Sequence, residues 1–312
     1  MAPMAPSGRA RVPAVLAAAI LAISMAAIFV RLADAPGVVI AFYRMALATL
    51  VMAPVTVRGL RRTPLRGRNL ALTALAGLLL GIHFATWITS LNITTVSASV
   101  TLVATVPLWV ALLAWLFSGR APSFSVLIGV VLAVGGAAVI GFGDLGGGTA
   151  PLLGDALALT GAASAAGYLL LGRSVQRTGI GLDAYAGAAY GIAALVLLPL
   201  PLLFGLDYRG YPPASFAWIA LLALVPQLIG HNGINYAMRH LDPTLVATTT
   251  LLEPIGSSLL ALVIFAEAPS VLTVVGAAIL LAGVVFTVRS SDPSGPAAMP
   301  AAAGVARLED EG

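Results

Sequence analysis

The chain lacks cysteine and lysine and is poor in charge. The absence of cysteine among its 312 residues excludes disulfides, thiolate metal sites and a cysteine nucleophile. All sixteen basic residues are arginine, which excludes a lysine Schiff base. Charged residues make up 9% of the chain, whereas soluble domains average about 25%. Apolar residues make up 60%, and the mean hydropathy is +1.02. The composition therefore excludes a soluble domain and predicts a protein that lipid surrounds.

Ten apolar runs are each long enough to cross a bilayer, which takes about 20 mostly apolar residues in a helix. The runs are residues 12–32, 37–57, 69–90, 95–117, 123–142, 152–172, 183–205, 214–237, 243–265 and 269–288. We therefore expect an all-α polytopic membrane protein with ten transmembrane helices. As a multi-pass protein it would lie in the cell membrane, either a bacterial inner membrane or a plasma membrane.

The first run resembles a signal peptide in part. Arg9 and Arg11 precede it, and Ala-Asp-Ala at 33–35 is similar to a cleavage site. The run is longer than the about 7–15 apolar residues of an ordinary signal sequence, so we expect a retained span. Residues 1–11 and 289–312 are rich in Pro, Ala, Gly and charge, and we expect them to be disordered cytoplasmic tails.

Arginines gather in the loops on one side of the predicted membrane. With the N-terminus inside, only Arg31 and Arg209 fall near the outer side, and Arg44 lies within a helix. The other thirteen fall on the cytoplasmic side: Arg9, Arg11, Arg58, Arg61, Arg62, Arg66, Arg68, Arg120, Arg173, Arg177, Arg239, Arg289 and Arg307. Because cytoplasmic loops carry the excess of basic residues, this count predicts an N-in, C-in topology. The net charge of +4 thus reflects topology, and we expect no nucleic-acid partner.

A stretch of the chain recurs at an offset of 147 residues. GRAPSFSVLIGVVLAVGG at 119–136 lies over AEAPSVLTVVGAAILLAG at 266–283, sharing Ala-Pro-Ser and two glycines. Small residues let helices approach closely, which predicts tight packing of the fifth and tenth spans and a homodimer contact through them. The glycines in question are Gly129, Gly135, Gly136, Gly276 and Gly283.

The repeat has an odd number of spans, which sets its orientation. Residues 12–142 and 151–288 hold five predicted spans each, so the second copy enters the membrane from the opposite side. Arg120 in an inner loop accordingly matches Glu267 in an outer loop. Two inverted five-helix repeats are a recurring architecture of secondary transporters, in which a site between the halves opens alternately to each side.

Three further stretches complete a likeness that extends over residues 14–290. They are AFYRMALATLVMAP at 41–54, GDALALTGAASAAGYLLLGRSVQ at 154–176 and LLEPIGSSLLALVIFAE at 251–267. With the two repeat ends, they resemble the drug/metabolite transporter superfamily, specifically its EamA-type carriers with ten helices. The resemblance implies export or exchange of amino acids, metabolites or small drugs, driven by a gradient of an ion or a solute.

The first repeat departs from this family's pattern in two places. Arg120 stands where the family usually has an acidic residue, and Val106-Pro107 stands where the second repeat has Glu253-Pro254. The sequence therefore does not support a coupling scheme that needs one carboxylate in each repeat.

Glu253 is the candidate for proton coupling. It lies midway along the ninth predicted span, where a charge costs about 2.5–3.5 kcal/mol, so a carboxyl there needs a reason. Pro254 removes a backbone hydrogen bond beside it, which makes Pro254 and Pro107 candidate helix breaks. Thr249, Glu253 and Ser257 are four residues apart and share a helix face. Two readings stay open: a proton carrier, or a hydrogen-bonded carboxyl that fixes helix packing.

Tyr43 and Arg44 are candidates for substrate binding in the second span. We expect Arg44 to hold a substrate carboxylate through paired hydrogen bonds. The alternatives are that its side chain extends outward to the interface, or pairs with Asp34 or Glu253.

Polar and aromatic residues occupy matching places in the third and eighth spans. His83 and Trp87 are one turn apart, and Asn232 and Tyr236 match them at an offset of 149. This pattern predicts the lining of a central cavity, and the alternative is hydrogen bonding between helices. The expected lining includes four more residues: Thr101, Gln227, His231 and Asn235. Because neither histidine has further ligands near it in sequence, we expect no metal site and no cofactor.

These features predict a secondary active transporter for efflux of a small metabolite, an amino acid or a related compound, coupled to protons. One alternative is a proton-independent exchanger or facilitator, although a phosphate-bearing substrate would need more basic groups than Arg44. Another is a membrane-embedded enzyme, which would need clustered acids or a nucleophile where only Glu253 lies mid-span.

Overall fold

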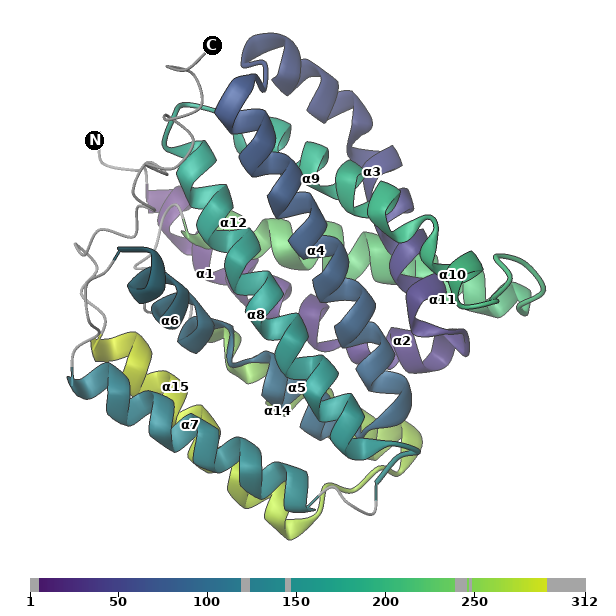
Figure 1. Cartoon of the computed structure of the whole chain (residues 1–312), viewed down its shortest axis with the longest axis vertical. Helices are drawn as coiled ribbons and strands as arrows, with labels where there is room; N and C mark the ends of the chain where they lie inside the picture. Colours follow the sequence, from purple (N-terminus) through teal and green to yellow (C-terminus); the bar gives the residue numbers. More distant parts are fainter. Residues whose placement is uncertain (1–5, 119–123, 144–146, 239–245, 247–248, 291–312) are drawn as a thin grey trace, which may run out of the picture.

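Every regular element that the structure describes is a helix (Figure 1). The computed structural model describes residues 6–118, 124–143, 147–238, 246 and 249–290. The helices of the first repeat are α1 (Pro6–Ser24), α2 (Ala26–Ala33), α3 (Gly37–Arg62), α4 (Gly67–Ile93), α5 (Val96–Val103), α6 (Val106–Ser118) and α7 (Phe124–Gly143). Those of the second are α8 (Pro151–Gln176), α9 (Leu182–Leu197), α10 (Leu200–Leu203), α11 (Pro213–Leu222), the π-helix η1 (Ala223–His231), α12 (Asn232–Met238), α14 (Leu252–Phe265) and α15 (Val271–Ser290).

Within the described residues, six helical stretches are long and apolar enough to cross a membrane: Val12–Ala33, Gly37–Arg62, Gly67–Ile93, Pro151–Gln176, Leu182–Leu203 and Pro213–Ile234. Four shorter apolar helices lie in the remaining predicted spans: Val96–Val110, Phe124–Ile140, Leu252–Phe265 and Val271–Phe286. Large apolar side chains such as Val131 and Val263 are 71% and 81% exposed, as lipid-facing side chains would be. The protein is therefore a polytopic membrane protein, and the count of ten spans stays a prediction.

The first helix begins earlier than the sequence suggested. α1 starts at Pro6, so residues 6–11 are helical, where we expected a disordered tail. Proline suits the first turn of a helix, and Ala and Arg are strong helix formers, which extends the helix beyond its apolar run. Residues 1–5 and 291–312, which make up most of the rest of the predicted tails, lie outside the described residues.

Two predicted spans are broken at equivalent places. α5 ends at Val103 and α6 begins at Val106, and α14 begins at Leu252 inside the predicted ninth span. Pro107 and Pro254 therefore lie in the first turns of α6 and α14. A first-turn residue has no helical partner for its amide, so proline costs nothing there. Both prolines were candidate helix breaks in the sequence, and each lies where a new helix begins within its predicted span.

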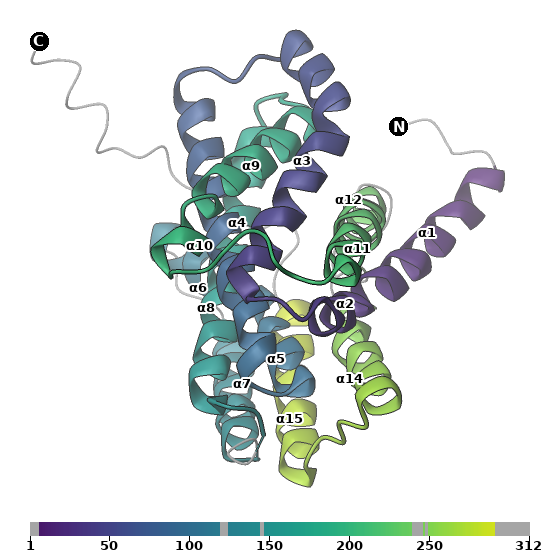
Figure 2. The same cartoon turned by 90° about the vertical axis from the view of Figure 1, so that its right-hand side faces the viewer.

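The packing of the helices has the symmetry of the repeat. α3 packs on α9, α5 on α14 and α7 on α15, and each of these pairs joins equivalent spans of the two copies. α4 packs on α8, and the equivalent pair of the other copy, η1 and α12 with α1, is also in contact. Figure 2 shows α1 beside α12 on one side of the bundle and α3 beside α9 on the other. Exchanging the two repeats thus reproduces the pattern of contacts.

Glycines fix the seam between α7 and α15, which lie side by side in Figure 1. A Cβ added to Gly136 would lie 2.6 Å from the carbonyl oxygen of Gly276, and one added to Gly283 would lie 2.6 Å from that of Gly129. Contacts move down α15 as they move up α7, so the two helices are antiparallel. Gly135 differs, because no described atom lies within 4 Å of its added Cβ. The seam glycines therefore pack the two repeats of one chain together.

Two faces of the bundle are named below by their residues. The Arg31 face carries the end of α2, the connection from α4 to α5 and the end of α14. The Gly181 face carries the end of α8 and the start of α9. α8 runs between them, because its first turns contact Thr94 and its last residue is Gln176.

Candidate functional site

Arg44 is fully buried in the second turn of α3. Its Nε and Nη2 atoms both donate to the side-chain oxygen of Gln227 on η1, at 3.0 and 2.6 Å. An isolated buried charge is costly, so a paired guanidinium at this depth is a feature that the fold maintains. The contact joins the first repeat to the second at the centre of the bundle.

Aromatic side chains of α4 cover the guanidinium. Its Cζ atom lies 4.1 Å from the ring centre of Phe84 and 5.7 Å from that of Trp87. Such cation–π contacts are worth about 2 kcal/mol where water is excluded. His83 stacks on Trp87 at 5.9 Å, and its Nδ1 lies 2.9 Å from the carbonyl oxygen of Gly161 on α8. α4 and α8 therefore fix the rings against which Arg44 rests.

A π-helical segment positions Gln227. α11 gives way at Ala223 to nine residues of π-helix, which contain Pro226. Proline has no backbone N–H, and wider turns accommodate that loss; single π-helical turns occur frequently at functional sites. Gln227 is 2% exposed, and its side chain lies near the hydroxyl of Tyr190 of α9. The unusual helix thus delivers an amide that accepts from Arg44 beside Tyr190.

Two hydrogen-bond donors at this site have no acceptor among the described residues. They are Nη1 of Arg44 and Nε1 of Trp87, and both atoms are buried. A buried donor left unsatisfied costs about 1–3 kcal/mol, and more when it is charged. A cation and a neutral N–H that both lack an acceptor favour an anionic ligand with two oxygens, such as a carboxylate.

Two further ionisable residues lie near Arg44. Glu253, in the first turn of α14, and His231, at the end of η1, are partly buried and interact electrostatically with Arg44. Glu253 forms no hydrogen bond and no ion pair within the described part of the chain, where the salt bridge found is that of Arg31 with Glu267. Glu253 therefore carries a carboxyl that nothing described holds in place.

A cavity of about 440 Å³ lies on the Gly181 side of this cluster. Its lining consists of Met52, Gly181, Leu182, Asp183, Ala186 and Asn232. Met52 is two turns beyond Arg44 on α3, and Asn232 is just over one turn beyond Gln227. The cavity therefore extends from the Gly181 face toward the buried cluster.

The structure brings together some of the predicted site residues. Arg44 contacts Gln227 and Trp87, and Trp87 contacts His83. His231 and Glu253 lie near Arg44, and Asn232 lines the cavity. Within the described residues no group of three or more His, Asp or Glu side chains is placed to hold a metal ion.

Other predicted residues lie apart from this cluster. The hydroxyl of Tyr43 donates to the carbonyl oxygen of Tyr208, 3.0 Å away. Thr101 is buried and donates within its own helix to Ser97. Tyr236 is 39% exposed, and the side chain of Asn235 lies outside the described residues.

Sequence reasoning missed Phe84 and Tyr190. Both read as ordinary core aromatics, and both are indeed buried, at 1% and 2% exposure. One signal was present for Tyr190, which lies 146 residues after Arg44, close to the offset of the repeat. Comparing the repeats at this position would therefore have marked an aromatic hydroxyl as the counterpart of the buried arginine. No such signal marked Phe84.

A lipid-exposed helical bundle with a charged site between two symmetrically packed repeats defines a membrane transporter. The model of the EamA-like transporter family matches residues 12–142 and 152–289, so the chain belongs to that family. This membership confirms the resemblance drawn from the sequence motifs. It also makes the protein a multi-pass protein of the cell membrane and a transporter rather than an enzyme.

Two individual proteins are similar to the chain. A "Probable terminal-alkyne amino-acid exporter" of Streptantibioticus cattleyicolor is 30% identical over 191 residues, which are 60% of this chain and 62% of that protein. The chain thus aligns with less than two thirds of that relative's length. A solved crystal structure is similar with a TM-score of 0.59 and 21% identity, over 89% of this chain and 96% of the other. The latter likeness concerns the fold alone.

Proposed function

We propose that the protein is a proton-coupled exporter of a small amino acid or a related carboxylate, working by alternating access between two inverted repeats. The observation that carries this proposal is the buried Arg44, held by Gln227 from the other repeat with Nη1 and the indole N–H of Trp87 lacking an acceptor. A carboxylate of the substrate accepts from both atoms. The aromatic rings of α4 form the apolar wall beside it.

The Gly181 face is the cytoplasmic face in this proposal. Arg58, Arg61 and Arg62 at the end of α3 lie toward it, as the excess of basic residues on cytoplasmic loops requires. The N-terminus and C-terminus are then cytoplasmic as well, with two five-span domains at 12–142 and 151–288. The cavity on this side admits substrate from the cytoplasm, as expected for an exporter that has not yet bound its substrate.

Glu253 is the proton-coupling residue of the proposal. Its carboxyl is partly buried, has no described hydrogen-bond partner and lies near the charge of Arg44. A carboxylate there attracts Arg44 and competes with the substrate carboxylate for it, whereas a protonated carboxyl does not. Proton binding and substrate binding are thereby linked through one cation. A homodimer through the face of α7 that carries Gly135, away from α15, is a further part of the proposal.

The test is transport by the purified protein in proteoliposomes. The substrates are a short terminal-alkyne amino acid, suggested by the name of the similar exporter, and its carboxamide, which has a similar shape but lacks the negative charge of the carboxylate. We expect flux of the acid and at least about 10-fold less flux of the amide, because a charged hydrogen bond is worth about 1.5–3 kcal/mol.

The variant Arg44→Lys sharpens this test. Lysine keeps the positive charge but loses the planar fork that contacts Gln227 and the ligand together, so transport falls at least about 10-fold. Equal transport of acid and amide, or unchanged transport by Arg44→Lys, would contradict recognition of a substrate carboxylate by Arg44. A proton-independent exchanger is distinguished by flux that persists without a pH gradient.

A further inference from the structure

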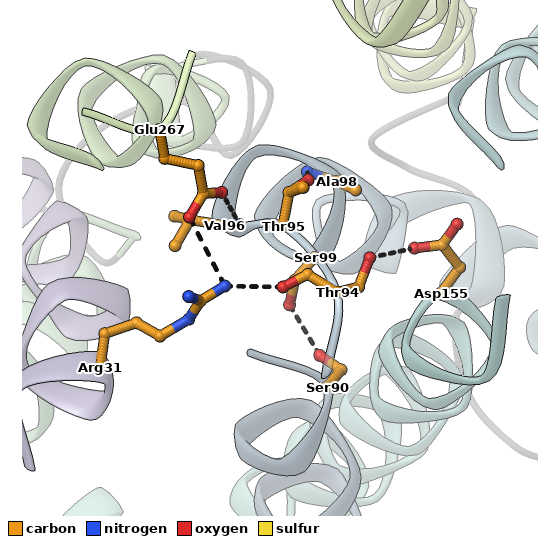
Figure 3. Close-up of polar contacts among 9 residues, drawn as sticks. All are labelled: Arg31, Ser90, Thr94, Thr95, Val96, Ala98, Ser99, Asp155 and Glu267. Carbon is orange, nitrogen blue, oxygen red and sulfur yellow. Dashed lines mark hydrogen bonds and ion pairs between the residues drawn. The ribbon is translucent and has the colours of Figure 1, made fainter. Parts of the chain in front are cut away.

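A polar cluster closes the bundle at the Arg31 face, as Figure 3 shows. Nη2 of Arg31 donates to the carbonyl oxygen of Thr94 at 2.6 Å and lies 3.6 Å from Oε2 of Glu267. The other carboxylate oxygen, Oε1, accepts from the amide of Val96 at 2.5 Å. Arg31 and Glu267 are 28% and 20% exposed, so solvent reaches both partners. We call these four residues the latch.

A left-handed residue lies near each charged residue of the latch. Asp34, which follows α2, has φ of 44°, and Ala266, which follows α14, has φ of 54°. These are the two non-glycine residues with positive φ in the described part of the chain. A left-handed conformation costs roughly 1–2 kcal/mol for an L-residue, so surrounding contacts must maintain it. Arg31 precedes one such residue and Glu267 follows the other.

The latch joins elements that also build the central site. Arg31, Thr94 and Val96 belong to the first repeat and Glu267 to the second. Thr94 follows α4, whose Trp87 covers Arg44, and Glu267 follows α14, which carries Glu253. Thr94 is held from the second repeat on its other side as well, because its hydroxyl donates to Asp155 of α8 at 3.0 Å. Separating the repeats at this face requires breaking the contacts of Glu267 with Arg31 and Val96.

By the repeat comparison, the opposite face carries two arginines in place of this pair. AIFVRLA at 27–33 lies over LLLGRSV at 169–175, which matches Arg31 with Arg173, and Glu267 matches Arg120 at the offset of 147. Two arginines repel where an arginine and a glutamate attract. Arg120 lies outside the described residues, so this comparison rests on sequence for that position. Within the described residues, one cavity of about 440 Å³ lies on the Gly181 side, and another of about 470 Å³ is lined by Asp207, Tyr208, Arg209 and Gly210 in the loop between α10 and α11.

We propose that the latch is a one-sided gate, which holds the Arg31 face closed while the site is reached from the Gly181 face. Because the sequence comparison gives this face an arginine and a glutamate and gives the other face two arginines, the latch biases the unloaded protein toward the state open at the Gly181 face. The inference rests on the alternating access proposed above. It requires neither a particular substrate nor proton coupling.

Cysteine labelling tests the gate directly, because the chain contains no cysteine and gives no background. Ser97→Cys reports on the Arg31 face: Ser97 adjoins Val96, and its hydroxyl is buried without a partner among the described residues. Met52→Cys reports on the cavity at the other face. Each reporter is labelled with a membrane-impermeant maleimide in sealed vesicles of known orientation, without substrate.

Glu267→Gln is the test variant, since glutamine still accepts from Val96 but loses the charge. Asp207→Asn is the matched control, because Asp207 is an exposed acid in the loop between α10 and α11, outside the latch. We expect Glu267→Gln to label Ser97→Cys about five-fold faster, the effect of losing roughly 1 kcal/mol of ion pairing. Labelling of Met52→Cys slows in the same variant, and Asp207→Asn changes neither rate.

Unchanged labelling in Glu267→Gln, or an equal response in Asp207→Asn, overturns the gate. Arg31→Gln repeats the test from the other partner and predicts the same two changes, so a folding defect of one variant leaves the other decisive. Because labelling uses no substrate, it stays readable if the amino acid or the proton coupling proves wrong. Conversely, unaltered labelling with intact transport contradicts the gate alone.

Discussion

The two repeats share their scaffold and differ in the residues that carry charge. The seam of α7 and α15 is symmetric, with Gly136 against Gly276 and Gly129 against Gly283. The helix breaks at Pro107 and Pro254 are symmetric too. Packing of this kind needs small residues and fixed turns in both copies, so symmetry is retained where the backbone requires it.

Charge and polarity break that symmetry. The first repeat supplies the cation Arg44 with its aromatic wall, and the second supplies Gln227 on a π-helix and Glu253 before its proline. The equivalent of Glu253 in the first repeat is Val106. The difference teaches that a duplicated bundle provides two similar halves, while a costly charge within the bundle need occur in only one of them.

The largest effect is expected at the symmetric seam. Gly136→Leu places a Cβ 2.5 Å from the backbone nitrogen of Leu280, where neither helix can yield without separating from the other. Overpacking costs about 1–3 kcal/mol and sometimes more, and here it opposes the contact between the repeats. We expect little or no monodisperse protein in size-exclusion chromatography.

Gly135→Leu is the matched control for that variant. It lies on the same helix, and its added Cβ meets no described atom within 4 Å. We expect it to give protein of normal yield. If Gly136→Leu were equally well folded, the seam would not hold the repeats together.

A smaller effect is expected where the repeats differ by a carboxyl. Glu253→Gln keeps the shape of the side chain and removes the site of protonation, so accumulation driven by a pH gradient falls about 100-fold, as for loss of an essential proton-transfer group. Exchange of substrate at equal pH on both sides persists, since Arg44 and Trp87 are intact. Flux in proteoliposomes with and without a gradient measures both quantities.

Placing an acid at the equivalent position of the other repeat completes this comparison. We expect the double variant Val106→Glu, Glu253→Gln to lack proton coupling, as Glu253→Gln alone does. The proposal requires the carboxyl to lie at position 253, near Arg44. Restored proton coupling in the double variant would show that the coupling carboxyl can lie in either repeat. Normal coupling in Glu253→Gln alone would remove Glu253 from the mechanism.

The sequence predicted the parts of the fold that depend on local composition and pattern. Apolar runs, the placement of arginines and the repeat led to a polytopic bundle of two halves, and motifs led to the family. Arg44, Trp87 and Gln227 stood out separately, because polar groups within apolar spans are costly. The structure brings these three together, and their role in binding substrate stays a prediction.

The remainder depends on contacts between distant segments. Arg31 and Glu267 are 236 positions apart, and only the packing of α2, α5 and α14 shows that they meet. Phe84 is indistinguishable from a core residue until Arg44 is placed over its ring. The π-helix at Gln227 likewise has Pro226 as its only local sign, and proline in other described helices of this chain either begins the helix, as in α8, or lies inside an ordinary α-helix, as in α1 and α3.

The smallest expected effect distinguishes a binding role for Trp87 from a packing role. Trp87→Phe keeps an aromatic ring beside Arg44 and His83 but removes the indole N–H, which has no acceptor among the described residues. If this N–H donates to the substrate, the variant raises KM about five-fold at unchanged maximal rate, as expected for one hydrogen bond of roughly 1 kcal/mol. A packing residue would instead alter thermal stability and leave KM unchanged.

Because an apolar replacement also relieves the cost of a buried unsatisfied donor, the substrate-free variant Trp87→Phe is expected to be slightly more stable than the parent protein. Higher stability together with weaker binding would thus separate the two roles, and unchanged KM would leave Arg44 as the single group that recognises the carboxylate.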